Sequence, residues 1–163
     1  MLKFRRITSD DYEAVAPLML ELHNFHAEGR PDVFRTAAMP TYEEFCERVA
    51  GGDKIALCAE SSGKIIAYTV VRLKKSTGDS SAMTAWMDDI YVIPSERRGR
   101  VGTMLYRMAE RAARERGAER LDLCVWCFNE DAAAFYRKCG FAPQRIVLEK
   151  DITVENFERE CGG

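Results

Sequence analysis

The feature that most limits the possible folds of this chain is a strand that leads into an amphipathic helix near residue 100. Residues 82–93 have the apolar and β-branched pattern of a strand, which Pro94 ends. A turn rich in arginine and glycine follows. Apolar residues then recur at helical spacing at Val101, Leu105, Met108, Ala109 and Ala112. Residues 120–128 read as another strand, so we expect a right-handed parallel crossover and an α/β fold.

The remaining segments supply antiparallel strands and further helices. Strand patterns cover 2–6, 54–60 and 64–73, and the last two are joined by a tight turn. Helical patterns cover 10–26, 41–51 and 131–138, and residues 142–152 read as a final strand. These elements predict a mixed, mostly antiparallel sheet flanked by helices. A length of 163 residues predicts one domain over residues 1–163.

Charge and hydropathy exclude several classes of protein. The chain has 24 Lys and Arg against 26 Asp and Glu, a net charge of −2, which argues against nucleic acid as the main partner. No apolar run is long enough to span a membrane, and the first residues do not resemble a secretion signal. We therefore expect a cytoplasmic protein that binds neither nucleic acid nor membrane.

Six cysteines allow a disulfide framework in principle, but a chain of this length without a secretion signal favours reduced thiols. Cys124 and Cys127 form a C-x-x-C pattern inside the expected strand 120–128. Residues three apart in a strand point to opposite faces, so this pair is not expected to share a metal or a disulfide. We expect no metal site and interpret the cysteines as small buried hydrophobic residues.

The turn between the strand and the helix predicts an anion site. The first N–H groups of a helix lack intrahelical acceptors and carry the positive end of the helix dipole. Gly99 and Gly102 allow close approach to the backbone, and Arg97, Arg98 and Arg100 add charge suited to phosphate oxygens. The pattern is neither a P-loop nor the glycine fingerprint of a dinucleotide site. It predicts a phosphate or pyrophosphate ligand without naming it.

Two blocks of sequence resemble the GNAT superfamily of N-acetyltransferases. Residues 89–105 are similar to its coenzyme A signature, a strand and a proline followed by R/Q-x-x-G-x-G/A. Arg97 takes the first position and Gly102 the last, but Arg100 stands where the middle glycine is usual. Residues 129–141 are similar to the family's N-x-x-A-x-x-F/L-Y-x-x-x-G-F block. The resemblance implies the GNAT fold, with splayed parallel central strands, and covers the C-terminal half best.

The resemblance also implies acetyl-CoA as co-substrate. The backbone of Ile90, Tyr91 and Val92 would pair with the pantetheine arm like an added strand. Asn129 would contact the pantetheine or set the strand end. The residues around the pyrophosphate would be Arg97, Arg98, Gly99, Arg100, Val101, Gly102 and Thr103.

In this family an acceptor amine attacks the thioester directly, which requires a neutral amine and a proton for the leaving thiolate. Tyr136 matches the position of the general acid, and it also faces the co-substrate. Asp88 and Asp89 are expected on opposite faces of their strand, so only one can face the cleft. Asp88 is our candidate base, with Asp89 structural; a water chain is the alternative.

The acceptor is less constrained. A primary amine of a small polyamine-like or amino-acid-like molecule is expected first, since the mild negative charge favours a cation. A protein N-terminus or lysine is the alternative acceptor, and a non-catalytic acyl-CoA-binding module is the alternative class. Residues 22–34, rich in polar and aromatic groups, could cover the acceptor or form a solvated loop; His26 could be an ordinary surface residue. Homodimers are common among relatives.

Overall fold

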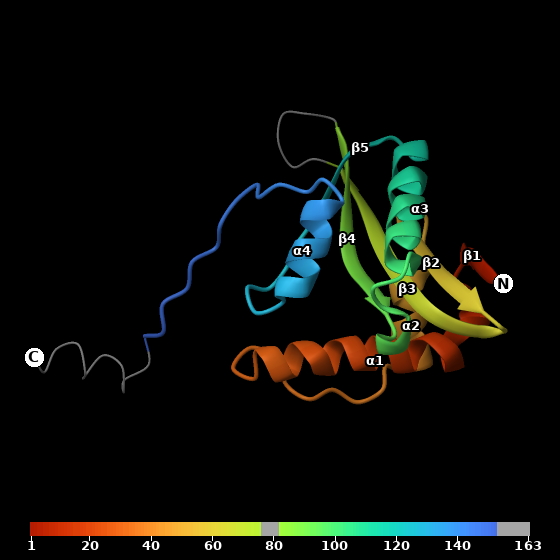
Figure 1. The fold of residues 1–163 in the computed structure, drawn as a ribbon, viewed down its shortest axis with the longest axis horizontal. Helices are drawn as coiled ribbons and strands as arrows, with labels where there is room; N and C mark the ends of the chain where they lie inside the picture. The colour runs from red at the N-terminus through yellow and green to blue at the C-terminus, as the bar shows by residue number, and fades with distance from the viewer. Residues whose placement is uncertain (76–81, 153–163) are drawn as a thin grey trace, which may run out of the picture. The chain divides into compact units, whose positions relative to one another are not determined.

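The structure is a computed structural model that describes residues 1–75 and 82–152 (Figure 1). Two compact units make up the chain, residues 1–130 and 131–163. The first holds a five-stranded sheet in the order β1-β2-β3-β4-β5. Its strands are β1 (Leu2–Arg6), β2 (Lys54–Ser61), β3 (Lys64–Lys75), β4 (Met83–Val92) and β5 (Ala118–Leu123). The first four pair antiparallel, whereas β4 and β5 are parallel, so the predicted mixed sheet is confirmed.

Three longer helices accompany the sheet: α1 (Tyr12–Gly29), α2 (Tyr42–Val49) and α3 (Val101–Glu115). Single 3-10 turns precede α1 (η1, Ser9–Asp11) and α3 (η2, Pro94–Glu96). The start of α2 is a complete capping box, in which Glu44 N–H donates to the Thr41 hydroxyl and Thr41 N–H donates to the Glu44 carboxylate. At the end of α3, Gly117 adopts φ +85°, the left-handed conformation that glycine provides without strain.

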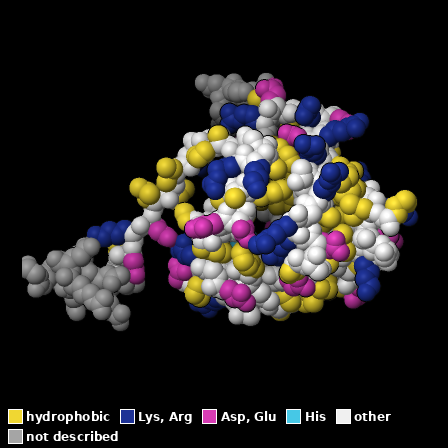
Figure 2. Space-filling view, viewed as in Figure 1, with side chains coloured by type: hydrophobic (Ala, Val, Ile, Leu, Met, Phe, Trp, Pro, Cys, Tyr) yellow, Lys and Arg dark blue, Asp and Glu magenta, His cyan; other side chains and the backbone are white. Residues whose placement is uncertain are grey.

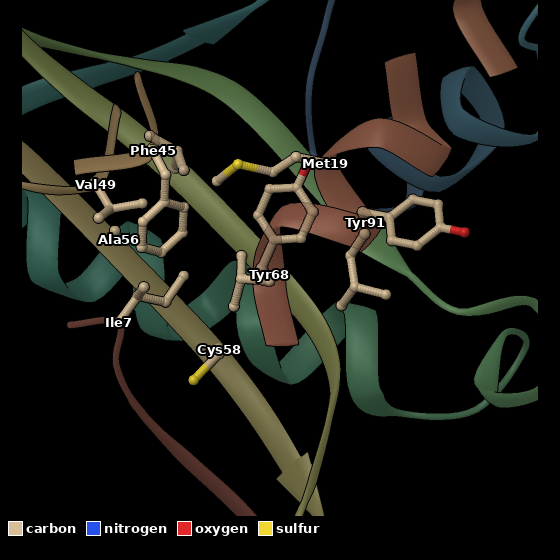
Figure 3. Packing of buried hydrophobic residues seen from close by; sticks show 11 residues of the cluster. Ile7, Met19, Phe45, Val49, Ala56, Cys58, Tyr68 and Tyr91 are labelled. Carbon is tan, nitrogen blue, oxygen red and sulfur yellow. The ribbon is translucent and has the colours of Figure 1, made fainter. Parts of the chain in front are cut away.

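The sheet is covered on both faces. Alternate residues of β2 and β3 pack against α1 and α2, with Ala56, Cys58, Tyr68 and Val70 meeting Val15, Met19, Phe45 and Val49 (Figure 3). The intervening residues face the other way, and α3 packs on β2, β3 and β4 there with Leu105, Ala109 and Ala113 buried. Strands buried on both faces read as continuous apolar runs, which is why residues 65–71 lack alternation.

Strand β4 has an extra residue at its centre. Val70 of β3 lies opposite Asp89, whereas Val71 lies opposite Met87, so Asp88 is a β-bulge. A bulge changes the face to which the following side chains point and bends the strand. On its other edge β4 pairs with β5 only from Met83 to Met87. Strand β5 ends at Leu123, the partner of Met87, so within the described residues the outer edge of β4 has no strand partner beyond Met87.

Two strand predictions were wrong, one at its end and one over its whole length. Strand β5 stops at Leu123, five residues before the expected end. Residues 142–152, expected as a strand, form no regular element, and Ile146, Val147 and Leu148 are exposed. Isoleucine and valine favour extended backbone, but a strand exists only where a neighbour supplies hydrogen bonds. Within the described residues, β5 is consequently an edge strand rather than a central one.

The early end of β5 also changes the cysteine interpretation. Cys124 and Cys127 lie in the connection after the strand, and both are exposed, so the prediction that they are buried was wrong. Cys58 is fully buried, and burial raises its pKa to about 11, in agreement with a hydrophobic role. Cys161 lies outside the described residues. Among the helices of the described residues, none is long and apolar enough to cross a membrane.

Candidate functional site

The turn between β4 and α3 has the features of an anion site. Arg98 adopts φ +62°, a left-handed conformation that is unfavourable for a residue with a Cβ. Arg100 is the N-cap of α3, and no side chain caps the helix there. The helix therefore begins with N–H groups that have no intrahelical acceptor. Gly99 has no left-handed conformation, and a Cβ there would lie 3.4 Å from the Glu96 carbonyl oxygen.

Arg97 ties this turn back to β4. Its Nε donates to the carbonyl oxygen of Val92 at 2.9 Å, and its guanidinium lies over the ring of Tyr91 at 5.4 Å. Arg97 therefore fixes the turn relative to the strand. On the visible face of the molecule, Lys and Arg side chains are interspersed with Asp and Glu rather than gathered into one basic surface (Figure 2).

The outer edge of β4 beyond Met87 carries the backbone groups that a bound chain could pair with. Ile93 N–H donates to Ile66 in β3 at 3.0 Å. Because antiparallel strands alternate the direction of their backbone groups, the N–H groups of Ile90 and Val92 point away from β3. The backbone of Tyr91 instead points to β3, and its side chain is buried with its hydroxyl donating to Glu21 at 2.5 Å. Burial and this hydrogen bond raise the pKa of Tyr91 to about 12.

The bulge brings both aspartates of β4 to the face covered by α2. Asp89 accepts two hydrogen bonds from Arg48 of α2, at 3.1 and 2.6 Å, and Asp88 accepts two from Arg72 of β3. The prediction that the two carboxylates lie on opposite faces was wrong, because simple alternation does not allow for an inserted residue. Asp89 is 8% exposed and its ion pair is structural, since an unpaired carboxylate there would be costly.

A cavity of about 500 Å³ adjoins this pair of aspartates. Its lining residues all carry charge, three acidic and three basic: Glu44, Glu47, Asp88, Arg48, Lys54 and Arg72. Arg48 and Arg72 were missed by the sequence analysis. A buried carboxylate signals that some cation must be near, but two arginines far apart in the sequence could not be chosen without the fold.

The end of α1 meets the connection after β5 in a cluster of rings. The ring of His26 stacks on Phe34 with centroids 5.6 Å apart, and the edge of Trp126 meets Phe34 at 5.4 Å. Arg30 lies over Trp126 at 5.0 Å. Gly29 permits this packing, because a Cβ there would lie 2.2 Å from the ring of Phe128. His26 is therefore a half-buried member of an aromatic cluster and not an ordinary surface residue.

Asn129 follows this cluster, and its N–H donates to the Trp126 carbonyl oxygen at 2.9 Å, which closes the turn after β5. Within residues 1–75 and 82–152, no group of three or more His, Cys, Asp or Glu side chains is placed to hold a metal ion.

The buried environment of His26 predicts a pH effect on stability. Burial lowers the pKa of His26 from 6.5, an effect that Asp89 opposes and His23 reinforces. Below pH 6.5 the unfolded chain binds a proton that the folded chain resists, so this residue makes the free energy of unfolding fall as the pH falls. Replacing His26 by glutamine should therefore give a smaller drop between pH 7 and pH 5 in urea unfolding. An equal decrease in the free energy of unfolding for the wild type and the variant would contradict this prediction.

Helix α4 (Glu130–Lys138) lies in the second unit from Asp131 onward and carries Tyr136. The Tyr136 ring packs edge-on against Phe141 at 5.6 Å and against Phe135 at 5.5 Å. Its carbonyl oxygen accepts the N–H of Phe141 at 3.1 Å, and Gly140 takes φ +95° to turn the chain back. These contacts fix the direction of the Tyr136 ring relative to its own helix.

Comparison with known families identifies the class of protein. Residues 19–141 match the Acetyltransferase (GNAT) family, which is more than half of the chain. The chain therefore belongs to the GNAT acetyltransferase family, and it is an N-acetyltransferase by that membership. No curated protein sequence matches it significantly.

Solved structures share this fold over most of the chain. A mutant of the BH1408 protein from Bacillus halodurans has a TM-score of 0.86 at 26% identity, covering 92% of this chain and 99% of its own. Glucosamine-6-phosphate N-acetyltransferase from Arabidopsis thaliana has a TM-score of 0.68 at 21% identity, covering 93% and 99%. AAC(6')-Iy in complex with the bisubstrate analogue CoA-S-monomethyl-acetylneamine has a TM-score of 0.73 at 15% identity, covering 93% and 98%.

Proposed function

We propose that this protein transfers an acetyl group from acetyl-CoA to a primary amine of a small polyamine-like or amino-acid-like molecule. The observation that carries the proposal is the outer edge of β4 beyond Met87, which has no strand partner within the described residues and leads through the arginine-rich turn to the uncapped start of α3. Family membership supports the reaction class, and the family match spans both compact units, so we treat residues 1–163 as one catalytic domain.

The residues available fit the parts of acetyl-CoA. The outward N–H groups of Ile90 and Val92 would pair with the amides of the pantetheine arm, as an added strand does. The N–H groups from Arg98 to Thr103 would hold the pyrophosphate, assisted by the guanidinium groups of Arg98 and Arg100. The backbone of Tyr91 points to β3 and would not pair with the pantetheine arm. The side chain of Tyr91 instead packs in the core beneath the site. Asn129, at the close of the turn after β5, would contact the pantetheine from the facing side.

When bound, acetyl-CoA supplies an activated thioester carbonyl. The chain's own groups would then handle two protons. Asp88 would accept a proton from the acceptor ammonium or its bridging water, so that a neutral amine attacks. Tyr136 would donate its phenolic proton to the departing thiolate. Direct attack forms one C–N bond and breaks one C–S bond, with no covalent intermediate on the enzyme.

The proposal is tested by measuring thiol release from acetyl-CoA with a panel of small primary amines, with calorimetric titration of CoA alongside. We expect CoA to bind and release to depend on an amine. If CoA binds but no small amine causes thiol release, and a peptide is then acetylated, the acceptor is a protein. Binding without any acetylation would favour the non-catalytic module, and absence of CoA binding would contradict the proposal entirely.

The left-handed Arg98 offers a test of the phosphate contact. Replacing Arg98 by alanine or by glycine should weaken CoA binding by about tenfold in both cases, the effect of losing one charge-assisted hydrogen bond. The glycine variant should be more stable than the alanine variant by roughly 1 kcal/mol, because the left-handed φ at this position is unfavourable for alanine but not for glycine. Titration calorimetry and urea unfolding measure the two effects.

Arg107→Ala, on the exposed side of α3, is the matched control and should bind CoA as the wild type does. Wild-type affinity in both Arg98 variants would exclude this side chain from the phosphate site.

A further inference from the structure

The cavity beside Asp88 contains two guanidinium groups that are held in place by carboxylates. Arg48 binds Asp89 through Nε and Nη2, and Arg72 binds Asp88 through the same two atoms. A guanidinium has five N–H donors, so the ion pairs use one edge of each group. In the described part of the chain, no hydrogen bond involves Nη1 of either residue, while both side chains line the cavity.

Two of the other charged residues in this cavity already form hydrogen bonds that stabilise the fold. Lys54 donates to the Glu47 carbonyl oxygen, and the Glu44 carboxylate caps α2. Both arginine side chains remain partly accessible, with 52% of Arg48 and 38% of Arg72 exposed. The groups that can still bind a ligand are therefore the Nη1 groups of both arginines, the Glu47 carboxylate and the remaining lone pairs of the Asp88 carboxylate, whose two oxygens already accept from Arg72.

We propose that this cavity binds the anionic group of the acceptor, so that the substrate is an amine that also carries a carboxylate or phosphate, such as an amino acid. This inference rests on the proposed function and narrows it. Arginine presents its donors in a planar fork suited to such oxyanions. Because the ion pairs already hold both guanidinium groups, binding an anion needs little further ordering of the side chains.

The mixed charge of the lining favours a zwitterionic acceptor over a polyamine. A polyamine carries only positive charge, and it would meet Arg48, Lys54 and Arg72 in this cavity. A zwitterion instead places its ammonium toward Asp88 or Glu47 and its oxyanion toward the arginines. Since the lining carries three acidic and three basic residues, a ligand with both signs matches it better than a ligand with a single sign. The cavity volume is in the range of small-molecule sites.

The test compares pairs of amines that differ only in the anionic group, with the wild-type protein and acetyl-CoA. The pairs are lysine with cadaverine, ornithine with putrescine, and O-phosphoethanolamine with ethanolamine. We expect kcat/KM to be at least tenfold higher for the anionic member of at least one pair. A difference in the amino-acid pairs indicates a carboxylate site, and a difference in the phosphoethanolamine pair indicates a phosphate site. Faster turnover of the diamines would overturn the inference while leaving the proposed function intact.

A variant tests the arginine directly. Arg48→Lys keeps a positive charge beside Asp89 but removes the Nη1 group that would bind the anion. KM for lysine should therefore rise about tenfold, while KM for cadaverine changes less than twofold. Arg111→Lys makes the same change on the exposed side of α3, outside the cavity, and should alter neither value. Equal effects on lysine and cadaverine in Arg48→Lys would overturn the inference.

If the protein acetylates no small amine, the proposed function is wrong. The proposed anion site is then tested separately, by measuring ligand binding without turnover. Calorimetric titration of lysine and of O-phosphoethanolamine into the wild type and Arg48→Lys should show binding of at least one that the variant weakens. Absence of binding to the wild type would overturn the proposed anion site.

Discussion

Replacing Tyr136 by phenylalanine should lower kcat by about 100-fold or more, the contribution typical of a positioned general acid. The substitution removes only the hydroxyl. The ring keeps its packing against Phe135 and Phe141, so the direction of the side chain on α4 should not change. CoA affinity should remain within about twofold, because a proton donor to the thiolate acts in the transition state rather than in the bound ground state. Steady-state kinetics and titration calorimetry measure both quantities.

The matched control for this hydroxyl is Tyr42→Phe. Tyr42 is 51% exposed on α2, so the same chemical change there should leave kcat and CoA binding as in the wild type. An acyl donor with a more acidic leaving thiol should also restore part of the Tyr136→Phe activity, because such a thiol leaves without protonation. Unchanged turnover in Tyr136→Phe would show that another group protonates the thiolate.

The elements around the proposed CoA site were predictable from local sequence. The strand, the arginine-rich turn and the amphipathic helix from Val101 each leave a short-range signal, in periodicity, in Pro94 and in Gly117. The capping box at Thr41 and Glu44 is equally local. The predictions failed where structure depends on a distant partner. Residues 142–152 have strand composition but, among the described residues, no strand to pair with.

The environment of Asp88 was beyond sequence reasoning for the same reason. A bulge leaves no composition signal, so strict alternation put Asp88 and Asp89 on opposite faces, whereas both meet arginines on one face. Their partners come from α2 and β3, distant in the sequence. The aromatic cluster around His26 likewise joins residues near 30 with residues near 127, and only the fold brings them together.

Replacing Asp88 by asparagine should lower kcat/KM at pH 7 by about 100-fold, the contribution of a general base. Asparagine has nearly the same size and keeps an oxygen that can accept from Arg72, so the bulge and the cavity should persist. The loss should shrink as the pH rises toward 10, because a primary amine of pKa near 10.4 then becomes neutral without a base. A pH profile of kcat/KM from 6 to 10 measures this.

The shape of that profile separates a base from a binding role. If Asp88 only attracted the acceptor, Asp88→Asn would raise KM and leave kcat at saturating acceptor close to that of the wild type. If a water chain relayed the proton elsewhere, kcat/KM at pH 7 would hardly change. Asp10→Asn, at an exposed position in η1, is the matched control and should follow the wild-type profile throughout. The base assignment therefore requires a loss at pH 7 in kcat as well as in kcat/KM, recovering toward pH 10, because only removal of the amine's proton depends on pH in that way.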